Sequence, residues 1–186
     1  MHSKESLYFL AAIPPAPLRN ELYELKREFA QQYKSSKALN SPAHITLVPP
    51  FGLEAGKVVH LTDAMQLVAP CFDPFILQID GFGVFAPKVV YLRIDDHPAL
   101  RRLQASLFEV LKPHHGQVAS HKVFIPHITL ANRDLAPEMF ELAWQQHKTT
   151  SYKRPFMLDS ISLLKHNGHR WEVEVEVALG KIFSPT

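Results

Sequence analysis

Two identical tetrapeptides carry the residues in this sequence that are best suited to chemistry. They are His44-Ile45-Thr46-Leu47 and His127-Ile128-Thr129-Leu130, each reached through a proline-containing approach. In an extended strand the side chains at positions i and i+2 point to the same face, so each histidine shares a face with its threonine. Two imidazoles and two hydroxyls that meet in one cleft suit a phosphate group. One imidazole can accept a proton, the other can donate one, and the hydroxyls can bind the non-bridging oxygens.

The repetition itself favours function over packing. A single histidine–x–threonine string in a strand is common, and is usually part of a half-buried face. Hydrophobic packing would specify the isoleucine and the leucine, but it gives no reason to repeat both polar residues. We therefore predict that His44, Thr46, His127 and Thr129 form one site.

Length, charge and cysteine content limit the class of protein. The chain has 186 residues, 46% of them apolar, which suits one domain or two small lobes that share a cleft. A net charge of +2 without a long basic run argues against extensive wrapping by nucleic acid, but allows contact with one or two phosphates. Cys71 is the only cysteine, so an internal disulfide and a thiolate metal cluster are excluded; we expect it to be buried.

No stretch of the sequence is long enough to span a membrane. The apolar run Leu7–Ile13 is short, follows Glu5 and ends at two prolines, so we interpret it as a first strand and not as a signal peptide. A cytoplasmic location is the resulting expectation.

The apolar periodicities predict the elements that must position the two motifs. We expect helices along apolar stripes at 18–29, 58–68 and 100–110, and a fourth from Pro137 to about His147. Lys26 is expected on the exposed side of the first helix. We expect strands at 7–13, 44–48 (ending at Pro49-Pro50), 75–79, 89–94, 127–130, 156–164 and 171–177, with a tight turn at Asn167-Gly168.

The order strand–helix–motif strand–helix–strand occurs twice. It predicts an α+β fold: a duplicated, bilobal arrangement with two mainly antiparallel sheets flanking a central cleft, and helices packed on the outside. Residues 1–186 would then form a single bilobal domain with an internal pseudo-two-fold repeat, each half carrying one motif. This symmetry is what would bring the two motif strands side by side.

With these motifs the chain resembles the 2H phosphoesterase superfamily, and within it the 2′-5′ RNA ligase or RNA 2′,3′-cyclic phosphodiesterase branch. The segment Gly81–Leu92 is similar to the glycine-phenylalanine hairpin of that branch, and Phe124–Arg133 is similar to its second motif with a nearby arginine. One departure follows the first motif, where the family commonly continues into Phe-Leu-Gly. Here the residues are Val48-Pro49-Pro50-Phe51-Gly52.

The resemblance implies a hydrolase that needs no metal or cofactor and opens 2′,3′-cyclic phosphates, on RNA ends or small nucleotides, to 2′-phosphomonoesters. Reversible 2′-5′ RNA ligase activity is also implied. We expect neither binding to a membrane nor an obligate protein partner. His44 would donate a proton to the leaving oxygen and His127 would activate water, although identical motifs do not by themselves rank the two. Thr46, Thr129 and Arg133 would bind the phosphate.

Several alternatives remain open. Phe51 and Phe85 could stack a base or belong to the core, and Arg133 could be an ordinary surface residue. The chain could be a non-catalytic nucleotide- or RNA-end-binding module. It could also be a metal-dependent phosphohydrolase in which both motif histidines join those of the loop that precedes the second motif, namely His114, His115 and His121. Because the loop lacks a zinc-like spacing and the motifs carry no acid, we expect instead a rim of the site, with Lys122 on one side and Lys34–Lys37 on the other.

Overall fold

The computed structural model of the chain describes residues 5–112 and 123–180. The loop histidines His114, His115 and His121 and the neighbouring Lys122 lie outside these ranges. The elements in order are β1 Glu5–Ala12, α1 Ala16–Tyr33, η1 Lys37–Asn40, β2 Ile45–Glu54, η2 Ala55–Lys57, α2 Val58–Val68, η3 Ala69–Cys71, β3 Phe75–Phe85, β4 Val89–Ile94, α3 Pro98–Leu111, β5 His127–Ala131, α4 Pro137–His147, β6 Lys153–Leu158, β7 Ser160–His166 and β8 Trp171–Ala178.

The described strands form one sheet, and not the two sheets that we expected. Its order is β6-β3-β4-β5-β2-β1-β7-β8, and every pair of neighbours is antiparallel. The two motif strands, β2 and β5, are neighbours at the centre and pair at Ile45 and Ile128. This short contact joins two four-stranded halves. The predicted α+β class with antiparallel pairing is confirmed, the separation into two sheets is wrong, and the bilobal domain stays a prediction.

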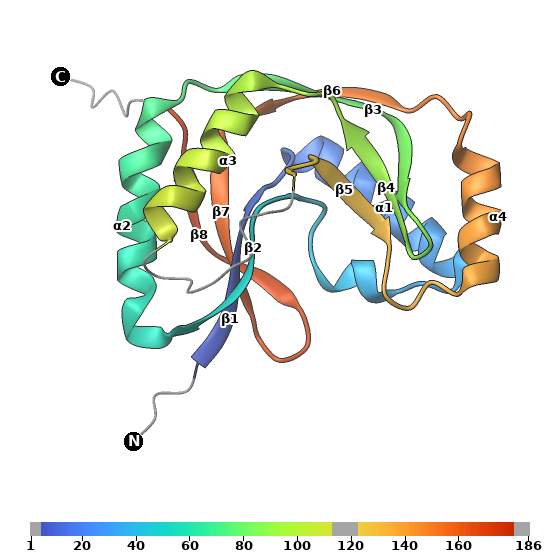
Figure 1. Cartoon of the computed structure of the whole chain (residues 1–186), viewed down its shortest axis with the longest axis horizontal. Helices are drawn as coiled ribbons and strands as arrows, with labels where there is room; N and C mark the ends of the chain where they lie inside the picture. The colour runs from blue at the N-terminus through green and yellow to red at the C-terminus, as the bar shows by residue number, and fades with distance from the viewer. Residues whose placement is uncertain (1–4, 113–122, 181–186) are drawn as a thin grey trace.

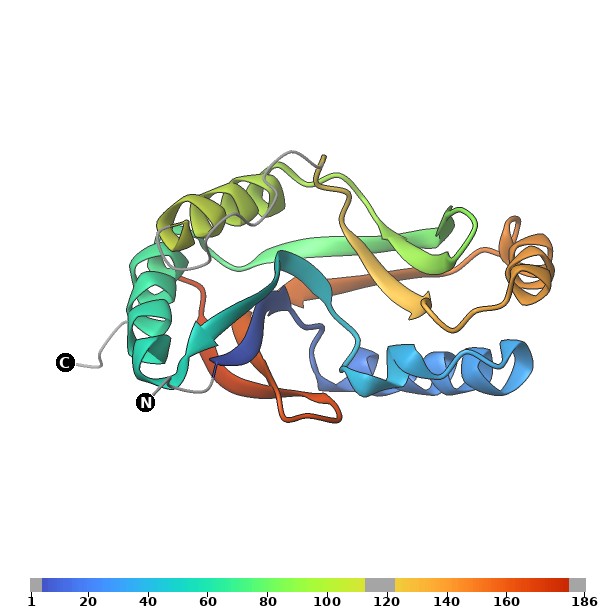
Figure 2. The same ribbon diagram turned by 60° about the horizontal axis from the view of Figure 1, so that its bottom comes forward.

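The chain crosses between the halves several times. Strand β3 follows α2 but pairs with β4, and β7 follows β6 but pairs with β1. Figures 1 and 2 show α1 and α4 beside β3, β4 and β5, and α2 and α3 beside the other half of the sheet. Because the crossovers interleave the two halves, neither is a contiguous stretch of sequence. The internal duplication stays a prediction.

Three strands differ clearly from the prediction. Strand β3 continues beyond Ile79 to Phe85, with a shift in its register against β4 between Ile79 and Phe82. Strand β2 continues through Pro49 and Pro50 to Glu54, because its register with β1 shifts there and the prolines need no amide hydrogen bond. The predicted strand 156–164 is two strands, since the chain breaks at Asp159 and passes from β3 to β1.

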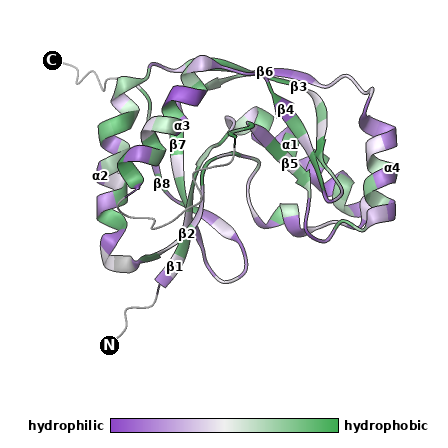
Figure 3. Cartoon of the chain, in the orientation of Figure 1, coloured by the Kyte–Doolittle hydropathy of each residue, from purple (hydrophilic) through white to green (hydrophobic). Residues whose placement is uncertain are grey.

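The core is built mainly by amphipathic helices packed on the sheet, and Figure 3 shows the mixed hydrophobic and hydrophilic residues of these helices. Helix α1 carries one surprise. Its buried stripe is Leu18, Leu22, Lys26, Phe29 and Tyr33, so Lys26 is buried at 2% exposure and the prediction of an exposed lysine is wrong. Cys71, predicted to be buried, is exposed.

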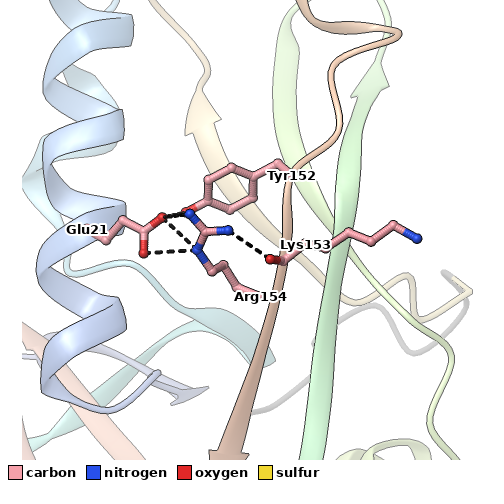
Figure 4. Close-up of polar contacts among 4 residues, drawn as sticks. All are labelled: Glu21, Tyr152, Lys153 and Arg154. Carbon is pink, nitrogen blue, oxygen red and sulfur yellow. Dashed lines mark hydrogen bonds and ion pairs between the residues drawn. The ribbon is translucent and has the colours of Figure 1, made fainter.

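Polar contacts tie α1 to β6 across the end of the sheet (Figure 4). The Glu21 carboxylate accepts hydrogen bonds from the Arg154 guanidinium at 2.9 Å and from the Tyr152 hydroxyl at 2.9 Å. The Arg154 hydrogen bond is the main cause that lowers the pKa of Glu21. Since the side chains of Arg154 and Glu21 remain 46% and 40% exposed, the pair orients α1 more than it stabilises it. None of the helices in the described part of the chain is long and apolar enough to cross a bilayer.

Gly83 is required by the close approach of an aromatic ring. A Cβ atom on Gly83 would lie 2.5 Å from a ring carbon of Tyr91, the residue opposite it in β4. We expect Gly83→Ala to lower the free energy of unfolding by about 1–3 kcal/mol, because the sheet cannot absorb the extra methyl without displacing that ring. Urea denaturation measures the change.

Gly56→Ala is the matched control, because a Cβ atom on Gly56 would have no neighbour within 4 Å. Its effect should stay within about 0.5 kcal/mol. Equal effects of the two substitutions would contradict a role for Gly83 in accommodating Tyr91.

Candidate active site

The pairing of β2 with β5 brings the four motif side chains together. Ile45 lies opposite Ile128, so the antiparallel register places His44 opposite Thr129 and Thr46 opposite His127. The two isoleucines are fully buried, and the polar residues that flank them are half-buried on the other face. Residues directly opposite each other have Cβ atoms about 5 Å apart, so the two histidines lie on a diagonal of one small polar cluster.

Both imidazoles are held in the same way by the backbone. His44 Nδ1 lies 2.7 Å from the Pro42 carbonyl oxygen, and His127 Nδ1 lies 2.8 Å from the Ile125 carbonyl oxygen. Because a carbonyl only accepts, each Nδ1 carries the proton and donates it. The other ring nitrogen, Nε2, is then the one that can exchange a proton with a ligand.

Aromatic side chains from the flanking strands fix the two rings. Phe9 of β1 lies 4.8 Å from His44 between ring centroids, and Tyr91 of β4 lies 5.0 Å from His127. Phe85 also packs edge-on against His127 at 4.9 Å. These contacts leave each imidazole little freedom to rotate away from the cluster.

Burial lowers the pKa of both histidines. The pKa of His44 falls to about 4, mainly through burial, and the charges of Lys26 and His127 lower it further, while its bond to the Pro42 carbonyl raises it. Burial also lowers the pKa of His127, against the opposing effect of the Ile125 carbonyl. Near pH 7 the free protein therefore holds both rings largely neutral.

Lys26 is a buried cation beside the first motif. Its Nζ donates a hydrogen bond of 2.7 Å to the Ser41 carbonyl, and burial lowers its pKa to about 8. No ion pair is found for it within the described ranges 5–112 and 123–180. The spacing of four from Leu22 and three to Phe29 already placed Lys26 on the buried stripe, and this signal was missed.

Two hollows of different chemistry meet at the polar cluster. A pocket of about 230 Å³ on the His44 side is mainly polar, with Lys37, Asn132 and Arg133 in its lining, together with the aromatic residues Phe9, His166 and Trp171. A groove of about 870 Å³ on the His127 side is mainly apolar, and its lining includes Phe85, Phe108, Val123, Phe124 and Ile125. Thr46 lines both, so the motif cluster lies at their junction.

Hydrogen bonds to Asp134 connect the two segments that carry the cations of the polar pocket, Lys37 and Arg133. Its carboxylate accepts hydrogen bonds from Ser35 Oγ at 2.8 Å, from the Ser36 amide at 2.9 Å and from the Lys37 amide at 3.1 Å. Partial burial raises its pKa, but these hydrogen bonds outweigh that effect and hold the pKa below its usual value. The loop that carries Lys37 is thereby fixed to the turn that carries Arg133, whose φ of 55° lies in the left-handed region.

The other predicted site residues have mixed outcomes. Arg133 lines the polar pocket and Phe85 lines the apolar groove. Phe51 is 5% exposed and belongs to the core, so its predicted role in base stacking is corrected. Phe51 lies six positions after Ile45 in β2, so the alternation of the strand already places it on the buried face of Ile45 and Leu47.

The sequence did not reveal His166, Trp171 or Asn132 as pocket residues, since they come from a different hairpin and from the end of β5. The Oδ1 atom of Asn132 is buried and has no hydrogen-bond partner within the described residues. Such an acceptor is costly unless a ligand or water satisfies it.

No group of three His, Cys, Asp or Glu side chains within residues 5–112 and 123–180 could hold a metal ion. The loop histidines of the metal hypothesis lie outside those ranges.

Replacement of Lys26 tests its electrostatic influence on His44. We expect Lys26→Met to raise the pKa of His44, because a nearby positive charge is removed, yet to leave it below about 6.5, because burial remains. An NMR titration of the His44 ring measures the shift. Lys148→Met, which removes an exposed lysine at the end of α4, is the control and should leave that pKa in place. An unchanged or lower value in Lys26→Met would contradict the assignment.

Comparison with known proteins places the chain in a family. The family described as the 2′-5′ RNA ligase superfamily matches residues 14–170. An RNA 2′,3′-cyclic phosphodiesterase of Geobacillus stearothermophilus is 30% identical over 139 residues, which cover 70% of this chain and 43% of that protein. A relative from Geobacillus thermodenitrificans, provisionally named a phosphoesterase, is 26% identical over 147 residues, which cover 77% of this chain and 80% of the relative.

Solved structures agree with the fold. E. coli LigT in complex with 3′-AMP has a TM-score of 0.66 at 20% identity, with 96% of this chain and 100% of LigT covered. The protein TT0787 of Thermus thermophilus has a TM-score of 0.68 at 20% identity, with 94% and 99% covered. These structures share the fold, and the match over residues 14–170 shows that the chain belongs to the 2′-5′ RNA ligase superfamily of 2H phosphoesterases.

Proposed function

We propose that the protein is a metal-independent phosphodiesterase that opens 2′,3′-cyclic phosphates, on RNA ends or small nucleotides, to 2′-phosphomonoesters. The observation that carries the proposal is the polar cluster at the β2–β5 pair, where two backbone-anchored imidazoles and two threonines share one face. The phosphodiesterase relative and the nucleotide and phosphate complexes of LigT support this class of substrate.

The reaction needs two proton transfers on opposite sides of one phosphorus atom. His127 Nε2 accepts a proton from water as the water oxygen bonds to phosphorus. The bond from phosphorus to the ribose 3′-oxygen breaks on the far side, and His44 Nε2 donates a proton to that oxygen. The phosphate then remains on the 2′-oxygen. The same path with a 5′-hydroxyl in the place of water would join RNA ends through a 2′-5′ linkage, since the new bond to phosphorus forms as the bond to the 3′-oxygen breaks.

The remaining site residues stabilise and orient the phosphate. The hydroxyls of Thr46 and Thr129 donate hydrogen bonds to the non-bridging oxygens, and Arg133 adds positive charge from the rim of the polar pocket. The Asn132 amide oxygen can accept a hydrogen bond from the 3′-hydroxyl that is released. Phe85, on the side from which the attack comes, offers an aromatic face to the base of a joining nucleotide.

Removal of either motif histidine is the direct test of this chemistry. We expect His44→Ala and His127→Ala each to lower kcat on a 2′,3′-cyclic nucleotide by at least about 100-fold, because one proton transfer is lost. Circular dichroism and the unfolding midpoint should show that both variants remain folded. His60→Ala, which removes an exposed histidine of α2, is the matched control and should keep wild-type turnover.

The same assay separates the alternatives when it is run with and without a chelator. Activity that is lost with the chelator and restored by zinc or manganese would support a metal-dependent phosphohydrolase. Binding of cyclic phosphates without turnover by the wild-type protein would support a non-catalytic module. Wild-type turnover in both motif variants would remove the proposed mechanism.

The lowered histidine pKa values predict an acidic optimum. The active form needs a proton on one ring and none on the other, and this form becomes scarcer as the pH rises above both pKa values. The cyclic phosphate itself does not titrate near neutrality. We therefore expect kcat/KM for a 2′,3′-cyclic nucleotide to fall between about pH 6.5 and pH 8, by up to about tenfold per unit. A profile that peaks at about pH 7.5 or above would contradict this expectation.

A further inference from the structure

A second groove continues the polar pocket away from the motif cluster. It has a volume of about 360 Å³ and lies between the first turns of α1 and the β7–β8 hairpin. Asn40, Ser41 and Trp171 line both hollows, so the polar pocket opens directly into this groove. The groove adds Arg19 and Tyr23 from α1 and Arg170 from the hairpin.

The charges of the groove suit a phosphodiester backbone. Within the described residues, the ion pairs include none for Arg19, and Arg170 pairs at 2.8 Å with Glu172, which also lines the groove. Lys37 and Arg133 supply two more cations in the adjoining polar pocket. The positive charges therefore outnumber the one carboxylate along this path. Tyr23, at 45% exposure, and Trp171 provide aromatic faces of the kind on which bases stack.

The apolar groove on the opposite side has a different character. Its described lining contains no lysine or arginine, and its one charged residue is Glu109. A phosphate backbone would lose its hydration there without gaining a cation. An RNA strand that enters the site is therefore expected to run along the polar side.

The proposed reaction fixes which end of a substrate lies on that side. This step rests on the proposed function, in which His44 donates its proton to the 3′-oxygen of the terminal ribose. That ribose must then lie on the His44 side, in the polar pocket. The next nucleotide toward the 5′ end leaves the pocket past Trp171.

We propose that the groove between α1 and the β7–β8 hairpin binds the RNA strand upstream of its 2′,3′-cyclic phosphate end, with Arg19 and Arg170 contacting the backbone phosphates. The protein then prefers cyclic-phosphate-ended oligonucleotides over cyclic mononucleotides. The base of the terminal or the preceding nucleotide stacks on Trp171.

The test compares two substrates in one double variant, Arg19→Gln with Arg170→Gln. The substrates are a 2′,3′-cyclic mononucleotide and a short RNA that ends in the same cyclic nucleotide. We expect kcat/KM for the RNA to fall by about three- to tenfold more than kcat/KM for the mononucleotide, as befits two solvent-exposed contacts. The dependence of log(kcat/KM) on log[salt] for the RNA should also become shallower by about 1.

The matched control is Arg27→Gln with Arg102→Gln, which removes the same charge from exposed sites outside the groove. Its two substrates should change by the same factor. Equal factors in the groove variant, or a wild-type protein that turns over both substrates equally well at low salt, would overturn the inference. If the wild-type protein cleaves neither substrate, the proposed function fails first. Binding of an RNA with a 2′-phosphate end, followed by Trp171 fluorescence in a Trp144→Phe background, then decides the groove separately.

Discussion

The short pairing between β2 and β5 is the contact on which the rest of the arrangement depends. It joins the two halves of the sheet at Ile45 and Ile128, and the antiparallel register there determines which polar side chains face each other. A slip of one residue would turn the histidines and threonines into the core and the isoleucines into the cleft. The buried isoleucines and leucines of both motifs oppose such a slip, because a shift by an odd number of residues would expose them and bury the polar side chains.

The crossovers of the chain support this central pair from both sides. From β2 the chain passes through α2 into β3, which pairs with β4 in the other half of the sheet. It later returns from β6 to β7, which pairs with β1. Each motif strand is thus braced by a neighbour that supplies an aromatic ring to its histidine, Phe9 on one side and Tyr91 on the other. The space for Tyr91 exists because Gly83 lacks a side chain. The glycine-phenylalanine hairpin therefore acts on the site through packing.

Much of this could be predicted from the sequence, for reasons that differ between elements. Helix α3 follows local apolar periodicity, Pro137 marks the start of α4, and the motif strands carry a repeated pattern, so these elements could be predicted. The single sheet could not be read from periodicity, because it depends on which strands pair across the crossovers. Of the two roles left open for Phe51, the core role follows from the alternation of β2, which places it on the same face as Ile45 and Leu47. Trp171 and Asn132 reach the polar pocket only through tertiary structure.

Identical tetrapeptides do not make identical histidines, and the difference lies in what surrounds them. His44 lies beside the buried Lys26 and faces a polar pocket, whereas His127 borders a groove lined with phenylalanines. Burial, and to a smaller extent the Lys26 charge, lower the pKa of His44, so a donor role there requires the negative charge of a bound phosphate to favour its protonated form. The anion would then be both substrate and the condition for its own protonation. Such coupling would keep the proton donor inactive until the site is filled.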